Sequence, residues 1–182
     1  MNSPVQTRTA VGAPRRVLFL LLASLLAFAA ACEVEPQAGG QVLKIFDGDS
    51  FIMRDEQGRE VEVRLQGIDA PERRQPWSRR SRQALVGMLR GHGIVIETVT
   101  VDAYDRTVAV AYRVSDGLNV NQEMVRQGHA WVYRRYTDDA ELIRMEAEAR
   151  EARRGLWSLP EAERIPPWQW RRDRRAGGGS GG

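Results

Sequence analysis

Residues 59–72 read REVEVRLQGIDAPE, and the first part of this stretch decides the fold. Apolar and charged residues alternate, so that Val61, Val63 and Leu65 fall on one face of an extended chain. A period of two is typical of a β-strand with one face buried and the other in water. Arg64 then lies on the polar face of a half-buried strand, close to the end of that strand.

The end of the same stretch gathers charged residues around a proline. Asp69 and Glu72 are three residues apart, Pro71 fixes the backbone between them, and Arg64 stands five residues before Asp69. Taken singly, each residue has an ordinary explanation, because turns favour Asp and exposed strand faces often carry Arg. Whether together they form a site depends on what the rest of the chain brings to them.

Four more strands and three helices are expected between residues 41 and 170. Two short strand segments surround Asp47-Gly48-Asp49, and two longer ones follow at residues 94–101 and 107–114. Helical spacing of apolar residues, with glycines as stop signals, predicts helices within residues 78–91, 119–128 and 138–155.

The order of these elements points to a fold class. Three strands, a helix, two strands and two helices do not alternate as βαβ units do, so a doubly wound parallel sheet is not expected. Five short strands with a helix inserted after the third suit a small closed barrel. We therefore predict an α+β, mainly β, domain: a five-stranded OB-type Greek-key barrel with about three helices, over residues 41–170.

The first 31 residues are predicted to be an export signal. Arg15 and Arg16 precede an apolar run from Val17 to Ala31 that ends in small residues, as secretory signals do. The run is shorter than the ~20 apolar residues that a membrane span usually needs, so export is favoured over an uncleaved anchor. The protein is expected to act outside the cytoplasm, as a cell-envelope lipoprotein or a secreted protein.

Cys32, the only cysteine of the chain, directly follows Ala29-Ala30-Ala31. Its position resembles that of the lipid-modified cysteine of bacterial lipoproteins, and lipidation there would attach the protein to a membrane. Plain cleavage after Ala31 is the alternative, and it would leave a soluble protein with an incidental thiol. Residues 32–40 follow as a short polar tether.

A basic and then glycine-rich tail is predicted for residues 171–182. Its arginines could contact phosphates, but such a run is more often solvated, and the glycine-rich end is expected to be disordered. Three tryptophans precede this tail. They are expected to cap the core or dock a terminal segment rather than stack on bases: Trp157, Trp168 and Trp170.

The net charge gives no argument for a nucleic-acid partner. The chain has 27 basic and 24 acidic residues, a net charge of +3. Arg8, Arg15 and Arg16 lie in the export signal, before the first acidic residue, Glu33, so the remainder carries 24 residues of each sign. Any argument for a polyanionic partner must come from how the charges are arranged.

Four pieces of sequence carry a resemblance to a known family: DGDS (47–50), RLQGIDAPE (64–72), DAYDRT (102–107) and NQEMVRQGHAWVY (121–133). In this order and spacing they resemble the thermonuclease, or staphylococcal nuclease-like, family, over roughly residues 44–157. Each piece is weak alone, whereas their order, spacing and agreement with the strand pattern make the combined match specific.

The resemblance implies a calcium-dependent hydrolase of DNA, RNA or both, which cuts within the strand and leaves 3′-phosphate ends. Calcium would be held by Asp49, Asp69 and the backbone carbonyl of Ala70, oxygen ligands that suit a hard cation. Arg64 and Arg106 would grip phosphate oxygens with their planar guanidinium groups.

Glu72 would orient or deprotonate the attacking water, and three tyrosines would lie near the substrate: Tyr104, Tyr133 and Tyr136. Asp105 departs from the family pattern, since glycine commonly precedes the arginine there, and its charge could weaken anion binding. The alternative is a non-catalytic OB-type nucleic-acid-binding module, and a third hypothesis is an interaction protein that uses the barrel as a scaffold. The intact charged set argues against the non-catalytic module, and a monomer is expected.

Overall fold

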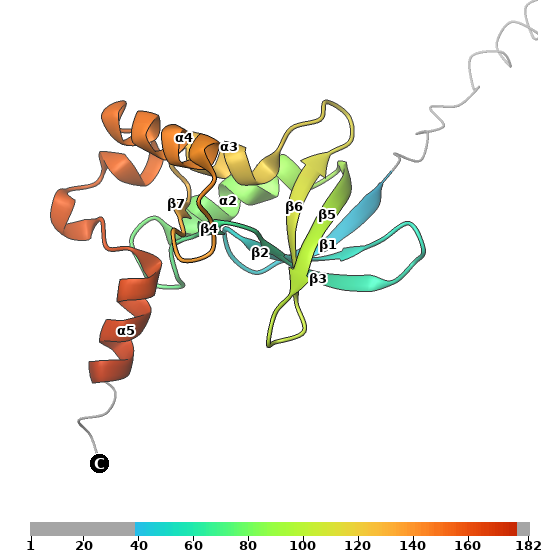
Figure 1. Cartoon of the computed structure of the whole chain (residues 1–182), viewed down its shortest axis with the longest axis horizontal. Helices are drawn as coiled ribbons and strands as arrows, with labels where there is room; N and C mark the ends of the chain where they lie inside the picture. Colours follow the sequence, from blue (N-terminus) through green and yellow to red (C-terminus); the bar gives the residue numbers. More distant parts are fainter. Residues whose placement is uncertain (1–38, 178–182) are drawn as a thin grey trace, which may run out of the picture. The chain divides into compact units, whose positions relative to one another are not determined.

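The computed structural model of the chain describes residues 39–177 (Figure 1). The predicted export signal, Cys32 and nearly all of the tether lie outside the described residues, as does the end of the glycine-rich tail. Between residues 39 and 177, no helix is both long and apolar enough to cross a membrane.

Five strands close into a barrel, which confirms the predicted fold class. Going round the barrel, the strand order is β1-β2-β3-β6-β5, and each neighbouring pair is antiparallel except β3 and β6, which are parallel. The strands span Gly40–Ile45 (β1), Ser50–Arg54 (β2), Glu60–Leu65 (β3), Gly93–Val101 (β5) and Thr107–Arg113 (β6).

The structure confirms the alternation of buried and exposed side chains predicted for strand β3. Val63 and Leu65 are buried in the barrel, whereas Glu60 and Glu62 are exposed and Arg64 is half-buried. Side chains from the other strands complete one continuous core in which hydrophobic burial supplies the main stabilising term. Its fully buried members from β2, β5 and β6 include Phe51, Ile94, Ala109 and Ala111.

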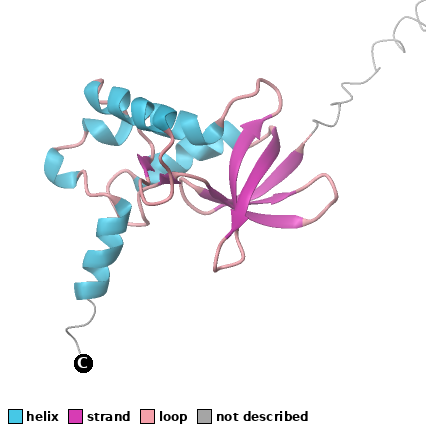
Figure 2. Ribbon diagram, in the orientation of Figure 1, coloured by secondary structure: helices cyan, strands magenta, loops and turns pink. Residues whose placement is uncertain are grey.

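Helices gather beside the barrel, as Figure 2 shows. The three predicted helices are present, and two begin with a side-chain cap: Asn119 accepts the Gln122 amide in α3, and Asp139 accepts two amides in α4. A fourth helix, α5, was not predicted. The helices span Ser78–Leu89 (α2), Val120–Arg126 (α3), Ala140–Glu151 (α4) and Pro167–Gly177 (α5), and two short 3₁₀ turns span Gly155–Ser158 (η2) and Glu161–Glu163 (η3).

Strand β3 ends at Leu65, and the chain turns before Ile68. Gly67 has a φ of +74°, a left-handed conformation that glycine adopts at little cost, and it turns the chain after β3. A separate two-residue strand, β4 (Ile68–Asp69), then pairs with β7 (Trp131–Val132), so that Asp69 lies opposite Trp131. This small sheet fixes the backbone at Asp69.

The predicted boundary at residue 170 is wrong, because α5 continues to Gly177. A second apolar cluster holds this helix: Trp131, Leu156 and Trp157 are buried, and Trp168 of α5 packs against them. The tryptophans therefore dock a terminal segment, as expected from the sequence. Arg171, predicted to belong to a solvated tail, is only partly exposed and forms ion pairs.

Candidate active site

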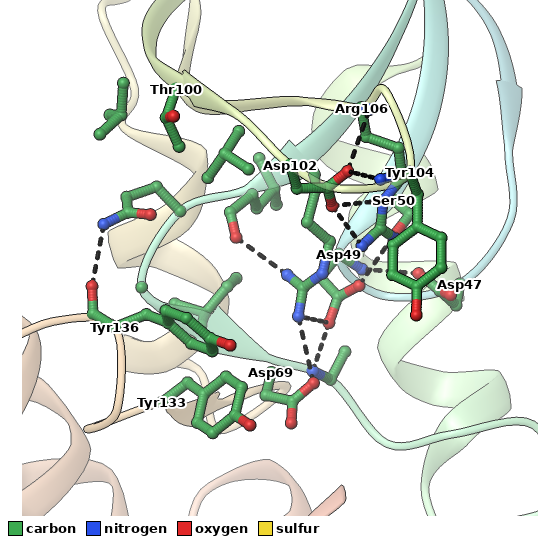
Figure 3. Close-up of a pocket in the computed structure, with 18 of the residues that line it drawn as sticks. Asp47, Asp49, Ser50, Asp69, Thr100, Asp102, Tyr104, Arg106, Tyr133 and Tyr136 are labelled. Atoms are coloured by element: carbon green, nitrogen blue, oxygen red, sulfur yellow. Dashed lines mark hydrogen bonds and ion pairs between the residues drawn. The ribbon is translucent and has the colours of Figure 1, made fainter. Parts of the chain in front are cut away.

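A cavity of about 820 Å³ opens where the barrel meets helix α5 and the loop before α2 (Figure 3). Its lining comes from the β1–β2 turn, the end of β3, β4, the β5–β6 hairpin, the segment after β7 and α5. The structure brings together in this cavity all of the site residues predicted from the described part of the chain: Asp49, Arg64, Asp69, Ala70, Glu72, Tyr104, Arg106, Tyr133 and Tyr136.

Two buried aspartates and one arginine form the floor of the cavity. Nη2 of Arg64 lies 3.2 Å from Oδ2 of Asp49 and 3.1 Å from Oδ1 of Asp69, so a single guanidinium nitrogen contacts both carboxylates. The amide of Ala70 also donates to Oδ2 of Asp49 at 2.5 Å. The two carboxylates, 20 positions apart in sequence, therefore converge on one point.

The register of the barrel explains this convergence. Ser50 of β2 pairs with Arg64 of β3, and the amide of Leu65 donates to the carbonyl of Asp49 at 2.9 Å. The turn before β2 is packed tightly, because a Cβ added at Gly48 would lie only 1.8 Å from Oγ of Ser81. Together these contacts hold Asp49 beside Arg64.

Burial and mutual repulsion act on the carboxyl groups of this cavity. Desolvation raises the pKa of Asp69 to about 6, against the lowering effect of its hydrogen bond from Arg171. Desolvation, and then the negative charge of Asp49, raise the pKa of Asp47 to about 7. A cation beside these carboxyl groups would favour their charged form.

Oxygen ligands of this kind fit a hard divalent cation. Within residues 39–177, no group of three or more His, Cys, Asp or Glu side chains is arranged to hold a metal ion. A metal at this point would therefore rest on the carboxylates of Asp49 and Asp69, with backbone carbonyls and water completing its shell. The donor set fits the ion that the sequence resemblance implies.

Glu72 is held at the edge of the same floor. Its backbone amide donates to Oε1 of Gln75 at 2.9 Å, and Gln75 in turn donates from Nε2 to the carbonyl of Ile165 at 2.5 Å. The buried Gln75 thus ties the loop of Glu72 to the segment that leads into α5. Oε1 of Glu72 lies 2.6 Å from Nη1 of Arg171.

Arg171 is the site residue that sequence reasoning missed. Its guanidinium meets Asp69 with two nitrogens, Nη2 to Oδ2 at 2.7 Å and Nη1 to Oδ1 at 3.1 Å, and Nη1 also donates to Glu72. Its contacts with Asp69 make the two-pronged geometry of a strong charge-assisted pair. One signal was available: Trp168, Arg171 and Arg175 recur at helical spacing, which places them on one face of α5.

Arg106 is paired within its own hairpin. Nε and Nη2 donate to Oδ2 of Asp102 at 2.9 and 2.7 Å, so the carboxylate that binds Arg106 is Asp102 and not the neighbouring Asp105. Asp105 has a φ of +64°, in the left-handed region, which explains why glycine suits this position. Tyr104, at the hairpin tip, is 82% exposed, and Arg106 lies 5.6 Å from its ring centroid.

The two other predicted tyrosines lie on the opposite side of the cavity (Figure 3). Tyr133 and Tyr136 meet edge to face, with ring centroids 4.9 Å apart. Tyr133 also stacks on Trp168, with centroids 5.2 Å apart and planes 1° from parallel. Tyr136 is 60% exposed. The ring of Tyr133 therefore serves mainly to seat α5, and Tyr136 is the freer of the pair.

An OB-type barrel whose mouth carries paired carboxylates beside guanidinium groups has the parts needed to bind and cleave a phosphodiester, the chemistry of a nuclease. The comparisons with known proteins lead to the same class. A family model described as "Staphylococcal nuclease homologue" matches residues 62–159. The chain belongs to this family, and it is a nuclease, a hydrolase of nucleic acid.

Three bacterial relatives align over most of their own lengths. The chain is 40% identical to "Protein ParB" of Escherichia coli over 161 residues, covering 83% of this chain and 89% of that protein. It is 40% identical over 132 residues to an "Uncharacterized endonuclease" of Escherichia coli O157:H7, covering 72% and 84%. A "Micrococcal nuclease" of Shigella flexneri is 38% identical over 143 residues, covering 73% and 80%.

Proposed function

We propose that the chain is a calcium-dependent endonuclease that acts outside the cytoplasm on DNA, RNA or both and leaves 3′-phosphate ends. The observation that carries this proposal is the convergence of Asp49 and Asp69 on one nitrogen of Arg64, in a cavity that also contains Glu72 and Arg106. A site built only to bind a phosphate backbone would not need buried, mutually repelling carboxylates.

Asp49, Asp69 and the carbonyl of Ala70 are the proposed calcium ligands. A carbonyl ligand is insensitive to the side chain it belongs to, so an alanine at position 70 is compatible with this role. Calcium, when bound there, would supply Lewis acidity and a fixed point for a phosphate oxygen. The small β4–β7 sheet and the Ala70 amide bond to Asp49 hold these groups in place before substrate arrives.

Arg64 and Arg106 are proposed to bind the phosphate. The guanidinium of Arg64 is next to both ligand carboxylates, and its other nitrogen, Nη1, is held by the carbonyl of Leu65 at 2.9 Å. Arg106 approaches from the β5–β6 hairpin, oriented by Asp102. Two guanidiniums, one on β3 and one in the hairpin, can grip separate phosphate oxygens, and such contacts strengthen as charge grows in the transition state.

Glu72 is proposed as the group that takes the proton from the attacking water. Nη1 of Arg171 contacts both Oε1 of Glu72, at 2.6 Å, and Oδ1 of Asp69, at 3.1 Å, so the candidate base lies beside the candidate ligand. A general base must lie within hydrogen-bond reach of its water. The Gln75 bond to the Glu72 amide keeps the loop at this distance.

Digestion of supercoiled plasmid and of folded RNA tests this function. With calcium, the chain should nick plasmid and fragment RNA, and a chelator should stop both reactions. The new ends should resist extension by a polymerase until a phosphatase has removed the 3′-phosphate. Binding of both nucleic acids without cleavage would instead identify a non-catalytic binding module. If the chain neither binds nor cleaves them, only the scaffold hypothesis remains.

Export and anchoring are proposed from residues outside the described part of the chain. The placement of Cys32 after three alanines at the end of the apolar run supports lipidation of its thiol. Stable anchoring normally takes two acyl chains, which a diacylated cysteine provides. In the native host, Cys32→Ser should move the protein from the membrane fraction to the soluble one. An unchanged distribution between the two fractions would remove the lipoprotein proposal.

A further inference from the structure

A second cavity, of about 430 Å³, adjoins the active site. It shares Tyr133, Arg171 and Arg175 with the first cavity, so the two are continuous along one face of α5. Its lining contains no carboxylate. It consists of two aromatic residues and five arginines: Tyr133, Trp168, Arg134, Arg135, Arg171, Arg172 and Arg175. The first cavity, in contrast, balances its arginines with aspartates and a glutamate.

Most of the guanidinium groups in this second cavity are not neutralised. Arg171 pairs with Asp69 and Glu72, and Arg134 lies 3.5 Å from Glu146. Among residues 39–177, no ion pair is formed by the three remaining arginines, all of them exposed: Arg135, Arg172 and Arg175. Like charges held this close repel one another, and a polyanion lying between them would remove that repulsion.

The helix that carries these arginines is docked against the rest of the domain. Pro167 is buried at the start of the helix, and Trp168 stacks on Tyr133 and meets Trp131 edge to face, with centroids 5.9 Å apart. The Gln75 bond to the carbonyl of Ile165 fixes the preceding turn. Arg171, Arg172 and Arg175 lie three, four and seven residues after Trp168, so helical spacing places them on the same side of α5 as this docked tryptophan.

We propose that α5 and the turn after β7 form a second phosphate-binding subsite, which holds the nucleic-acid strand beyond the phosphate that is cleaved. This proposal rests on the proposed function and extends its substrate site. Arginine suits the role, since its planar group binds phosphate oxygens with two nitrogens. The stacked faces of Trp168 and Tyr133 cover each other and are closed to bases. The subsite therefore reads the backbone and not the sequence.

Substrate length gives the sharpest test. The double variant Arg172→Gln/Arg175→Gln removes two unpaired charges, and Gln keeps the helix propensity of α5. The matched control is Arg79→Gln/Arg90→Gln, two exposed arginines of α2 and its C-cap that line neither cavity. For each protein, kcat/KM is measured in calcium on a 12-nucleotide single strand and on a dinucleotide. The ratio of the two values should fall about tenfold in the α5 variant and stay unchanged in the control.

Binding in chelator tests the subsite without catalysis. Affinity for the labelled 12-nucleotide strand is measured over a range of salt concentrations. The slope of log affinity against log salt should be smaller by about 1.4 in the α5 variant, because each phosphate of a single strand that the protein neutralises adds about 0.7 to this slope. The control should keep the wild-type slope, and circular dichroism should show the same helix content in all three proteins.

Three results would overturn the subsite. One is an equal loss in both double variants, which would indicate only the general charge of the surface. Another is an unchanged length ratio together with an unchanged salt slope in the α5 variant. The third is loss of binding to vesicles of anionic lipid while strand binding stays intact, which would assign α5 to a membrane surface. If wild type cleaves neither substrate, the proposed function fails, whereas the salt slopes still decide whether α5 binds a strand.

Discussion

Asp105 shows how a single residue can carry strain at the edge of a site. It occupies the tip of the β5–β6 hairpin with a φ of +64°, and its carboxylate is not the one that binds Arg106. A non-glycine residue in the left-handed region is strained by about 1–2 kcal/mol, and glycine's greater freedom in the unfolded chain offsets about 0.5–1 kcal/mol of that.

Asp105→Gly should therefore raise the free energy of unfolding by about 0.5 kcal/mol, the difference between these two terms. Denaturant unfolding measures this change. The nuclease rate should be unchanged or higher, most clearly at low salt, where the removed negative charge is least screened. Loss of activity with an unchanged circular dichroism spectrum would show that Asp105 helps to build the site.

Arg106 is oriented by a two-nitrogen contact with Asp102, which leaves its charge near the cavity. Lysine keeps the charge but cannot reproduce the planar fork. Arg106→Lys should lower the turnover rate on the order of 10²-fold, comparable to removing one oxyanion donor. Steady-state kinetics on plasmid measures this loss.

The chain offers a matched control for Arg106. Arg59 makes the same kind of contact with Asp55, four residues before it, and lines neither cavity. Arg59→Lys should leave the rate at the wild-type value. A fully active Arg106→Lys enzyme would mean that only the charge is required at this position.

At the scale of elements, His129 joins α2 to the loop before β7. Nδ1 of His129 accepts the indole Nε1–H of Trp77 at 3.1 Å, a bond that only the ring with a deprotonated Nδ1 can make. Burial lowers the pKa of His129 below its ordinary value of 6.5, although the charge of Glu123 acts in the opposite direction. The folded protein thus resists protonation of this ring.

This lowered pKa determines the direction in which stability changes with pH. Above pH 6.5, the neutral ring of His129 contributes to the free energy of unfolding. This contribution is lost as the pH falls from 6.5 through the folded-state pKa, because the unfolded chain binds the proton first. His129→Gln can still accept from Trp77 and has nothing to titrate. From pH 8 to pH 5, the free energy of unfolding of wild type should fall relative to that of the variant.

The raised pKa values of Asp47 and Asp69 act in both proteins and cancel in this difference. His92→Gln removes the other of the chain's 2 histidines and shows which of them carries the effect. If the pH dependence persists in His129→Gln and disappears in His92→Gln, the assignment to His129 is wrong.

Most elements could be predicted because their sequences carry a local period. The alternation around Val63 defines β3, and the capped, amphipathic segment after Asp139 defines α4. The β4–β7 sheet has only two residues in each strand, too few for a period to show. Helix α5 is rich in arginine and was read as a solvated run, since its stability comes from the docking of Trp168, a tertiary contact that propensity does not contain.

At the scale of the whole molecule, the site is assembled from well-separated segments, and this limits what the sequence could predict. Asp49, Arg64 and Asp69 could be assigned because their short motifs, in this order and spacing, resemble the thermonuclease-like family. Arg171 enters from about 100 residues away and could not be assigned without knowing where α5 packs. Its place beside Glu72 shows that the C-terminal segment, predicted to be a solvated tail, lines the candidate active-site cavity.

Elements outside the barrel complete the candidate site. The barrel places the aspartates and Arg64, the hairpin places Arg106, and Gln75 ties the Glu72 loop to the turn that precedes α5. Each group is oriented by a contact from an element other than its own or by a partner within its loop. Such prior orientation is what electrostatic stabilisation of a transition state requires.

The most direct test of the central claim compares wild type with Glu72→Gln on supercoiled plasmid, in saturating calcium and in chelator. Cleavage by a wild-type preparation alone could come from contaminating nucleases. A difference between the two preparations could not, because the proteins differ only in one side chain, which is of the same size in both. We predict that chelator abolishes cleavage and that Glu72→Gln lowers the turnover rate by about 10²–10⁴-fold, while calcium affinity, measured by calorimetry, changes much less. A Glu72→Gln rate within a few-fold of wild type would contradict this mechanism and make Glu72 a structural residue.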